Sequence, residues 1–395
     1  MPITAQQLLS ELIALPSVNP AFLSGRAELT GEQRVADFLA FTADRAGLEL
    51  EWQEVSPGRS NLLIRLTPAG GKVRRRILLA PHMDTVGVDG EARFKPVVKA
   101  GRLHGRGACD TKGSIAVYLS AMLTVAESGA RPQETEIVLT ALVDEENGQT
   151  GSRALVAGTL LSPGSKRPKR HSGDKSVPTT LAIVGEPTLL KVVTAHKGDL
   201  WLRITAHGKA AHGSKPHLGR NAIHAMARIV SELETNYASS LRQRTHPLLG
   251  HATVNVGTIA GGKQPNIVPD WCSISIDRRT VPGESDAEVC RELRALLRRC
   301  GGGAELADTK HVPCPALETD PNLPLVRQLM QCAGQRQPAG VDYFSDAALL
   351  AAGGIPSVLL GPGDIAQAHT ADEWVALAQL ERGTRLLVKF LRDQP

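Results

Sequence analysis

The amino-acid sequence predicts an α/β protein interrupted by a smaller α+β domain, and three observations lead to this expectation. In the first half of the chain, apolar segments of strand length alternate with helical patterns. From Lys191 the pattern changes to alternating, half-buried strands and amphipathic helices. After the glycines at 301–303 the α/β pattern resumes.

The first domain begins with two helices. Apolar residues at helical spacing predict the first one, which Pro16 ends: Leu8, Leu9, Leu12, Ile13 and Leu15. The second is expected from Thr30 to Ala46. The strands "NLLIRL", "RRILLAP", "TEIVLTALV" and "TLAIVGE" then alternate with a helix from Ser114 to Glu127 and another near Arg153. Because these strands are nearly continuous apolar runs, we expect both faces of their sheet to be covered.

The inserted domain contains the strands "HKGDLWLRITAHG" and "CSISIDRRTV" and the helices "RNAIHAMARIVSELETNY" and "DAEVCRELRALLRRC". We expect residues 1–190 to form the first part of a catalytic domain and residues 191–304 to form the insertion. Residues 305–395, with "PLVRQLMQCAG" and "IPSVLLGPG", would complete the catalytic domain.

Composition is that of a globular protein. The 395 residues are 42% hydrophobic and 22% charged, and only 3% are aromatic, so aliphatic side chains must fill the core. The net charge is +5, but +4 of it lies within residues 166–175. The rest of the chain is close to neutral, which argues against a nucleic-acid-binding face.

The charged stretch lies in Ser162–Pro178, "SPGSKRPKRHSGDKSVP", which has no apolar periodicity. This composition predicts a flexible basic insertion at the surface. A basic docking patch is the alternative, because "KRPKR" resembles a localisation signal, although such runs are weak evidence alone.

The six cysteines form no CxxC pair, so zinc knuckles and thioredoxin-type motifs are excluded. Scattered cysteines indicate reduced thiols and a cytoplasmic protein. The N-terminus has no basic region before an apolar one, and no segment has the ~20 consecutive apolar residues of a membrane span.

Polar residues typical of metal sites follow five apolar strands or loops: His82 and Asp84, Asp110, Glu145 and Glu146, Glu186, and His369. Ligands of such sheets gather beyond the carboxyl ends of the strands. Imidazoles and carboxylates collected there suit a zinc-like ion, and without one the carboxylates would repel each other.

Each residue also has a structural alternative. His82 could be a histidine at a strand end with Asp84 as a surface carboxylate, and Asp110 could cap the helix near Ser114. Glu145 and Glu146 could be solvated turn carboxylates. Spacing favours the metal site, because His82 and Asp84 share a face, where Asp84 can accept the second ring N–H.

The motifs "PHMDTV", "GRGACDTKG", "DEENG", "GEPT" and "AHTADE" occur in that order, and the chain resembles the M20 metallopeptidase/deacylase family. This family includes acetylornithine deacetylase, succinyl-diaminopimelate desuccinylase, aminoacylase-1 and a carboxypeptidase that cleaves glutamate from folates. The resemblance implies a zinc-exopeptidase-like domain with a central mixed sheet flanked by helices. The insertion would be a ferredoxin-like lid and dimerisation domain.

The resemblance implies a dinuclear centre and a role for each residue. His82, Asp110 and Glu186 would bind one Zn²⁺, and Asp110, Glu146 and His369 the other, with Co²⁺ or Mn²⁺ as possible replacements. Asp84 would orient His82. Glu145 would be the general base for a water shared by the two ions. The Asp110–Thr111 peptide bond would be cis.

The inserted domain resembles the part of the family that completes the site in a homodimer. In "GKAAHGSKPHLGRNAI", His212 would polarise the scissile carbonyl in the partner's site. In "PNIVPDWCSISIDRRTVPGES", Asn266 and Arg278 would anchor the substrate, since an Arg can clamp a carboxylate through two N–H bonds.

The expected reaction is hydrolysis of the amide bond of N-acyl amino acids in amino-acid metabolism, as in acetylornithine deacetylase. A metallo-exopeptidase acting on dipeptides or acyl-glutamates and a succinyl-diaminopimelate desuccinylase are the alternatives. "GVDYFSDAALL" departs from the glycine-rich or Gly-Thr-Glu forms of the family, which leaves the acyl group and the side chain open.

Overall fold

The computed structural model describes residues 3–158, 177–301, 303–310 and 312–395. The chain divides into two compact units, which are described separately. The first contains residues 1–194, 319–339 and 345–395, and the second contains residues 195–318 and 340–344.

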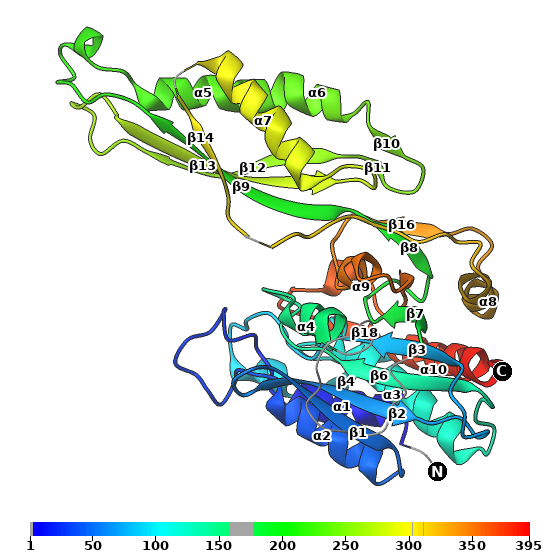
Figure 1. Ribbon diagram of the computed structural model, residues 1–395. Helices are drawn as coiled ribbons and strands as arrows, with labels where there is room; N and C mark the ends of the chain where they lie inside the picture. The colour runs from blue at the N-terminus through cyan, green and yellow to red at the C-terminus, as the bar shows by residue number, and fades with distance from the viewer. Residues whose placement is uncertain (1–2, 159–176, 302, 311) are drawn as a thin grey trace. The chain divides into compact units, whose positions relative to one another are not determined.

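The first unit is built on a sheet with both parallel and antiparallel pairs (Figure 1), which confirms the predicted fold class. In spatial order its strands are β1 (Glu49–Ser56), β2 (Arg59–Leu66), β6 (Thr135–Ala141), β3 (Arg75–Ala80), β7 (Thr179–Val184) and β17 (Ser357–Leu359). The pairs β6–β3, β3–β7 and β7–β17 are parallel, and β1–β2 and β2–β6 are antiparallel. The sheet continues through β8 (Val193–His196), where the chain leaves this unit, to β15 (Leu317–Glu318), and β16 (Ala339–Val341) also pairs with β8.

The central strands are covered on both faces. Every residue of β6 is buried, and so is all of β3 after Arg75. One aliphatic core joins the sheet to α1 (Ala5–Ala14), α2 (Gln33–Asp44), α3 (Lys112–Glu127), α8 (Pro324–Ala333) and α10 (Leu377–Arg392). α1, α3 and α10 pack against one another, as do α4 (Thr150–Gly158) and α9 (Ala347–Ala352). At the start of α1, Thr4 and Gln7 form a reciprocal capping box.

A second, three-stranded sheet in this unit joins two segments that are far apart in the sequence. It consists of β18 (Trp374–Ala376), β5 (Arg102–His104) and β4 (Val97–Lys99), in that order. The 3₁₀ helices η1 (Glu91–Phe94) and η4 (Ile365–Gln367) precede its strands. Pairing of β18 with β5 brings the segment after residue 365 to the loop before α3.

The second unit is a four-stranded antiparallel sheet in the order β12 (Thr253–Gly261), β13 (Trp271–Thr280), β9 (Gly198–His207) and β14 (Glu305–Asp308). Its helices are α5 (Ala222–Glu232), a π-helical turn at Leu233–Tyr237, α6 (Ala238–Leu241) and α7 (Asp286–Cys300). The 3₁₀ helix η2 (Pro216–Leu218) and the short hairpin of β10 (Thr245–His246) and β11 (Gly250–His251) complete it. The chain order of strand, helix, two strands, helix and strand is that of a ferredoxin-like unit.

The boundaries of this unit differ from the expected range of 191–304. The unit begins at Ala195, extends to Glu318 with β14 paired to β9, and also includes residues 340–344. Of the expected insertion at 162–178, residues 162–176 lie outside the described residues, as does the "KRPKR" run. Among the described residues, no helix is long and apolar enough to cross a membrane.

Candidate metal centre

The sheet topology positions the candidate ligands. β6, β3, β7 and β17 run parallel, so their carboxyl ends meet at one edge of the sheet. His82 follows β3, Glu145 and Glu146 follow β6, Glu186 follows β7, and His369 comes after β17 and η4. Asp110 is on the loop between β5 and α3, and its peptide bond to Thr111 is cis, which confirms that prediction.

Asp110 lies at the centre of this group and uses its two oxygens in different directions. Its Oδ1 is 3.1 Å from Nε2 of His82, and its Oδ2 is 3.2 Å from Nε2 of His369. The same His369 nitrogen is 3.1 Å from Oε2 of Glu146. Ligand atoms of His82, Asp110 and Glu146 all lie within 4.8 Å of one another. The Asp110 carboxylate therefore contacts His82 through one oxygen and His369 through the other.

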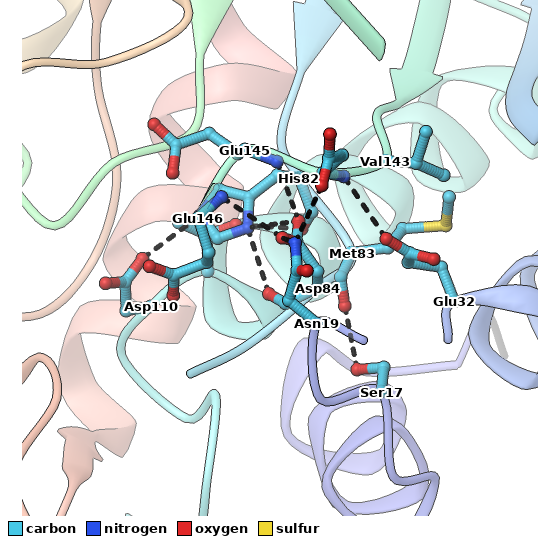
Figure 2. A network of polar contacts seen from close by, with 12 residues as sticks. Ser17, Asn19, Glu32, His82, Met83, Asp84, Asp110, Val143, Glu145 and Glu146 are labelled. Atoms are coloured by element: carbon cyan, nitrogen blue, oxygen red, sulfur yellow. Dashed lines mark hydrogen bonds and ion pairs between the residues drawn. The ribbon is translucent and has the colours of Figure 1, made fainter. Parts of the chain in front are cut away.

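Asp84 supports this group from below, as Figure 2 shows. Nδ1 of His82 is 3.0 Å from the Asp84 carbonyl oxygen and 3.4 Å from its Oδ1. The two carboxylate oxygens accept the backbone N–H groups of Glu145 and Glu146, each at 3.1 Å. Asn19 donates to Oδ2 of Asp84 at 2.8 Å and to Asp144 at 2.9 Å. Asp84 thus fixes one histidine ring and the backbone of both glutamates.

Glu186 and Glu145 are acidic groups in surroundings that oppose their charge. Burial raises the pKa of Glu186 well above its ordinary value, and the neighbouring charge of Asp110 raises it further. Its Oε1 is buried and has no hydrogen-bond partner among the described residues. Burial also raises the pKa of Glu145 well above its ordinary value, and the carboxylates of Glu186 and Asp346 add to the effect.

The two histidines carry positive charge beside these carboxylates. Hydrogen bonds to Asp110 and Glu146 raise the pKa of His369 to about 10. Burial opposes the charged form of His82, but its bonds to Asp110 and Asp84 outweigh burial and raise its pKa well above the ordinary value. Burial likewise opposes ionisation of Asp110, yet bonds to His369 and His82 lower its pKa.

These residues fit a pair of divalent cations. Zinc accepts imidazole nitrogens and carboxylate oxygens as donors. The site offers both kinds, from His82, His369, Asp110, Glu146 and Glu186. The unpartnered Oε1 of Glu186 is a buried acceptor that a cation would satisfy. Positive charge would also relieve the repulsion that raises the pKa values of Glu145 and Glu186.

Glu373 is a supporting residue that the sequence did not indicate. Its Oε1 accepts the backbone N–H groups of Cys109 at 2.8 Å and Asp110 at 3.0 Å. Its Oε2 accepts from the N–H of Gly107 at 2.9 Å and from Arg106 at 2.7 Å. The one available signal is its place four residues after His369, directly before the strand β18, which pairs with β5.

Within the second unit, the structure brings His212 and Asn266 to neighbouring segments. Gly213 donates its N–H to the carbonyl of Asn266 at 2.7 Å, and both His212 and Asn266 are exposed. His212 Nδ1 is 2.7 Å from Oγ of Ser214. Two residues expected to meet the substrate therefore share one exposed surface.

Arg278 lies elsewhere in the second unit. It is fully buried, its Nη2 is 2.5 Å from Oε1 of Glu284, and its Nε donates to Tyr237 at 3.3 Å. Residues on β13 alternate between buried and half-exposed, and Arg278 is on the buried face with Ile274 and Ile276. Its guanidinium is thus engaged inside the unit, and the role as a substrate clamp stays a prediction.

Comparison with known proteins identifies the family and relatives of this chain. The model described as "Peptidase family M20/M25/M40" matches residues 78–393. Acetylornithine deacetylase of Aliivibrio fischeri is 30% identical over an alignment of 396 positions, which covers 98% of this chain and 96% of that protein. Acetylornithine deacetylase of Proteus mirabilis is 29% identical, again over 98% of this chain and 96% of that protein.

Solved structures share the fold. Aminopeptidase PepT from Bacillus cereus matches with a TM-score of 0.75 at 21% identity, covering 99% of this chain and 98% of that one. An M20 family metallo-carboxypeptidase from Sulfolobus solfataricus matches with a TM-score of 0.74 at 19% identity, covering 98% of each chain. The chain belongs to the peptidase family M20/M25/M40, and it is a metal-dependent hydrolase of amide bonds.

Proposed function

We propose that this protein removes the acyl group from N-acyl amino acids by hydrolysing their amide bond. The observation that supports this most directly is the division of the Asp110 carboxylate between His82 and His369, beside the buried Glu145. The similarity to acetylornithine deacetylases over nearly the whole chain supports an N-acyl amino acid as the substrate.

In this proposal His82, Asp110 and Glu186 hold one Zn²⁺, and Asp110, Glu146 and His369 hold the other. When bound, the cations polarise an amide carbonyl and lower the pKa of water toward about 7. Co²⁺ and Mn²⁺ suit the same donors. Asp84 keeps the His82 ring in place through its contacts with Nδ1.

Glu145 is the proposed general base. Its backbone N–H is fixed on Asp84, while its side chain has no role in the ligand contacts described above. Its carboxylate takes a proton from the attacking water and delivers it to the leaving nitrogen, so that the amino acid departs as a neutral amine.

The second unit supplies the remaining proposed groups. His212 would polarise the carbonyl in the site of a partner subunit, and Asn266, exposed beside it, would anchor the substrate. A homodimer is supported by β12, an edge strand on which Ile259 is 61% exposed. All six cysteines are unpaired, which supports a reducing, cytoplasmic location.

Turnover of a substrate panel by the zinc-loaded protein tests this proposal. The panel contains N-acetylornithine, other N-acetyl amino acids, N-succinyl-diaminopimelate, dipeptides and an acyl-glutamate. We expect chelator-sensitive release of free amino acid from the N-acyl amino acids. Hydrolysis of dipeptides or of the acyl-glutamate instead would assign the protein to the exopeptidases and refute the deacylase proposal.

Glu145→Ala tests the general base on the same panel. We expect it to bind two metal ions per chain and to lose about 10²- to 10⁴-fold in kcat, because proton transfer is lost while the ligands stay. Metal content by elemental analysis accompanies the kinetics, and Glu11→Ala at an exposed site of α1 is the control. Near-normal turnover of Glu145→Ala would remove Glu145 from this role.

A further inference from the structure

Asp346 is a buried carboxylate that none of the proposed roles uses. It directly precedes α9 and is only 1% exposed. Its Oδ1 accepts a hydrogen bond from Oγ of Ser152 at 2.7 Å, and its Oδ2 is buried with no partner among the described residues. Burying an acidic group costs free energy, so its presence here calls for a function.

Ser152 connects Asp346 to the turn that contains Glu145. Ser152 is in the first turn of α4, and its Oγ is also 3.0 Å from the carbonyl oxygen of Gln149, the residue that precedes this helix. The side chain of Gln149 in turn donates from Nε2 to the carbonyl oxygen of Glu145 at 2.7 Å. Four residues thus connect α9 to the backbone of Glu145.

The turn that carries Glu145 needs such support. Asp144 and Gln149 both have left-handed backbone conformations, with φ of 67° and 51°, which are unfavourable for residues other than glycine. Asp84 holds the N–H groups of Glu145 and Glu146 on one side. Gln149 holds the carbonyl of Glu145 on the other, so the peptide groups flanking Glu145 are fixed from both directions.

We propose that Asp346 is a positioning residue, which holds Ser152 and the start of α4 so that Gln149 fixes the Glu145 turn. The inference rests on the proposed role of Glu145. It gives a function to the "FSDAALL" segment, in which an Asp stands directly before a short helix that packs on α4. Asp346 acts through a hydrogen bond and does not touch the reacting atoms.

Charge alone is the competing explanation, because Asp346 also contributes to the raised pKa values of Glu145 and Glu186. The two explanations predict different behaviour of the conservative variant. Asp346→Asn keeps an oxygen that accepts from Ser152 but removes the charge. Asp346→Ala removes both, and Ser152→Ala removes the hydrogen bond and keeps the charge.

Steady-state kinetics of these variants is the first measurement. We expect Asp346→Ala and Ser152→Ala to lose about 10- to 100-fold in kcat with little change in KM, because a small misplacement of a catalytic group has effects of this size. The double variant should lose no more than either alone, since both break one connection. Asp346→Asn should keep most of the activity, and a loss equal to that of Asp346→Ala would overturn the proposal.

Hydrogen exchange of the backbone amides gives a second measurement that needs no substrate. We expect peptides covering residues 142–150 to exchange faster in Asp346→Ala and Ser152→Ala than in the wild type and in Asp346→Asn. Ser120→Ala is the matched control, because Ser120 is a buried serine on α3 that donates to the carbonyl of Ile3 at 3.3 Å. Unchanged exchange at 142–150 in both variants would refute the positioning role.

These measurements separate the two proposals. A wild-type protein that hydrolyses no N-acyl amino acid would refute the proposed function, while the exchange data would still decide whether Asp346 fixes the turn. An active enzyme with normal kcat in Asp346→Ala would refute the positioning role alone. Thermal unfolding of each variant shows whether a loss comes from global destabilisation.

Discussion

Among single residues, Asp84 combines two tasks that are separate in many metal sites. It contacts Nδ1 of His82, and its carboxylate accepts the N–H groups of Glu145 and Glu146. It is fully buried, and Asn19 satisfies part of its remaining acceptor capacity. The proposed ligand His82 and the proposed base Glu145 therefore depend on the same side chain.

Replacing Asp84 should weaken metal binding as well as catalysis. For Asp84→Ala we expect about a 10- to 100-fold loss of zinc affinity, which is typical for removal of a group that orients a ligating histidine. Competition with a chromophoric chelator measures this affinity. Asp89→Ala, at an exposed position of the following loop, is the control, and equal affinities of the two variants would contradict this reading of Asp84.

Metal binding should release protons. In the metal-free protein, bonds to Asp110 and Glu146 raise the pKa of His369 from 6.5 to about 10. Its proton therefore stabilises the metal-free fold fully below about pH 6.5, and this contribution is lost as the pH rises through 10. Because a metal ion needs the neutral ring, it must displace that proton, and the apparent affinity should rise with pH across this window.

Calorimetric titration of zinc at pH 7 in buffers of different ionisation enthalpy measures this release. The wild type should release protons on binding, and His369→Asn should release fewer. Binding heats that do not depend on the buffer would show that His369 is already neutral before the metal binds.

The gathering of the candidate ligands at the strand ends could be predicted from the sequence, because His82, Glu145, Glu146 and Glu186 each follow an apolar strand and the parallel pairs bring these ends together. For Arg278, the sequence contains a pattern that predicts a buried position. The alternation in "CSISIDRRTV" places it on the face of Ile274 and Ile276, inside the unit. The sequence does not distinguish Glu373 from its neighbour Asp372, because both are acidic. Tertiary packing buries Glu373 and leaves Asp372 exposed.

At the scale of elements, the loop from Gly105 to Thr111 depends on a segment more than 260 residues away. Glu373 accepts three of its backbone N–H groups and pairs with Arg106, and all of these partners are buried or nearly so. The loop thus takes its shape from β18 and the residue before it rather than from its own sequence.

Glu373→Ala should therefore destabilise the fold. It leaves the buried Arg106 without its carboxylate, a change that typically costs about 3–5 kcal/mol. Urea denaturation of the metal-free protein measures the free energy of unfolding. Asp372→Ala is the matched control, since its side chain is 82% exposed, and we expect an effect within about 0.5 kcal/mol. Similar losses in both variants would contradict this role of Glu373.

Element types were predicted more accurately than their bounds. The four apolar strands correspond to β2, β3, β6 and β7, and the helix expected from Ser114 to Glu127 begins earlier, at Lys112. The sequence provides no bounds for the edge strand β12, because "TVNVGTIAG" contains two glycines and several exposed side chains. Its pairing with β13, and not its own composition, defines it as a strand.

At the scale of the whole molecule, the proposed action of His212 in the site of the partner subunit can be tested by combining two variants in one dimer. Glu145→Ala and His212→Ala should each be nearly inactive as homodimers. In a mixed dimer, the site with an intact Glu145 would receive His212 from the other subunit. Half of the dimers would be mixed and each would hold one complete site, so roughly a quarter of the wild-type activity should return.

Mixing the two variants under conditions of subunit exchange, with sedimentation analysis in parallel, provides the test. The sedimenting species should have twice the 42.0 kDa mass of the chain. A mixture of each variant with itself is the control. A monomer, or a mixture without regained activity, would show that His212 does not act in a partner's site.

The interruption of the first unit also has a consequence for synthesis on the ribosome. His82, Asp110, Glu145, Glu146 and Glu186 emerge early, but His369 and Glu373 follow only after the whole second unit has been made. At about 5–20 residues per second, the nascent chain carries an unfinished centre for on the order of ten seconds or more. Strand β17, which pairs with β7 in the sheet, arrives in the same late segment. If His369 holds the second ion as proposed, that position is complete only after residue 369 has been made, whereas the residues proposed for the first ion are already present.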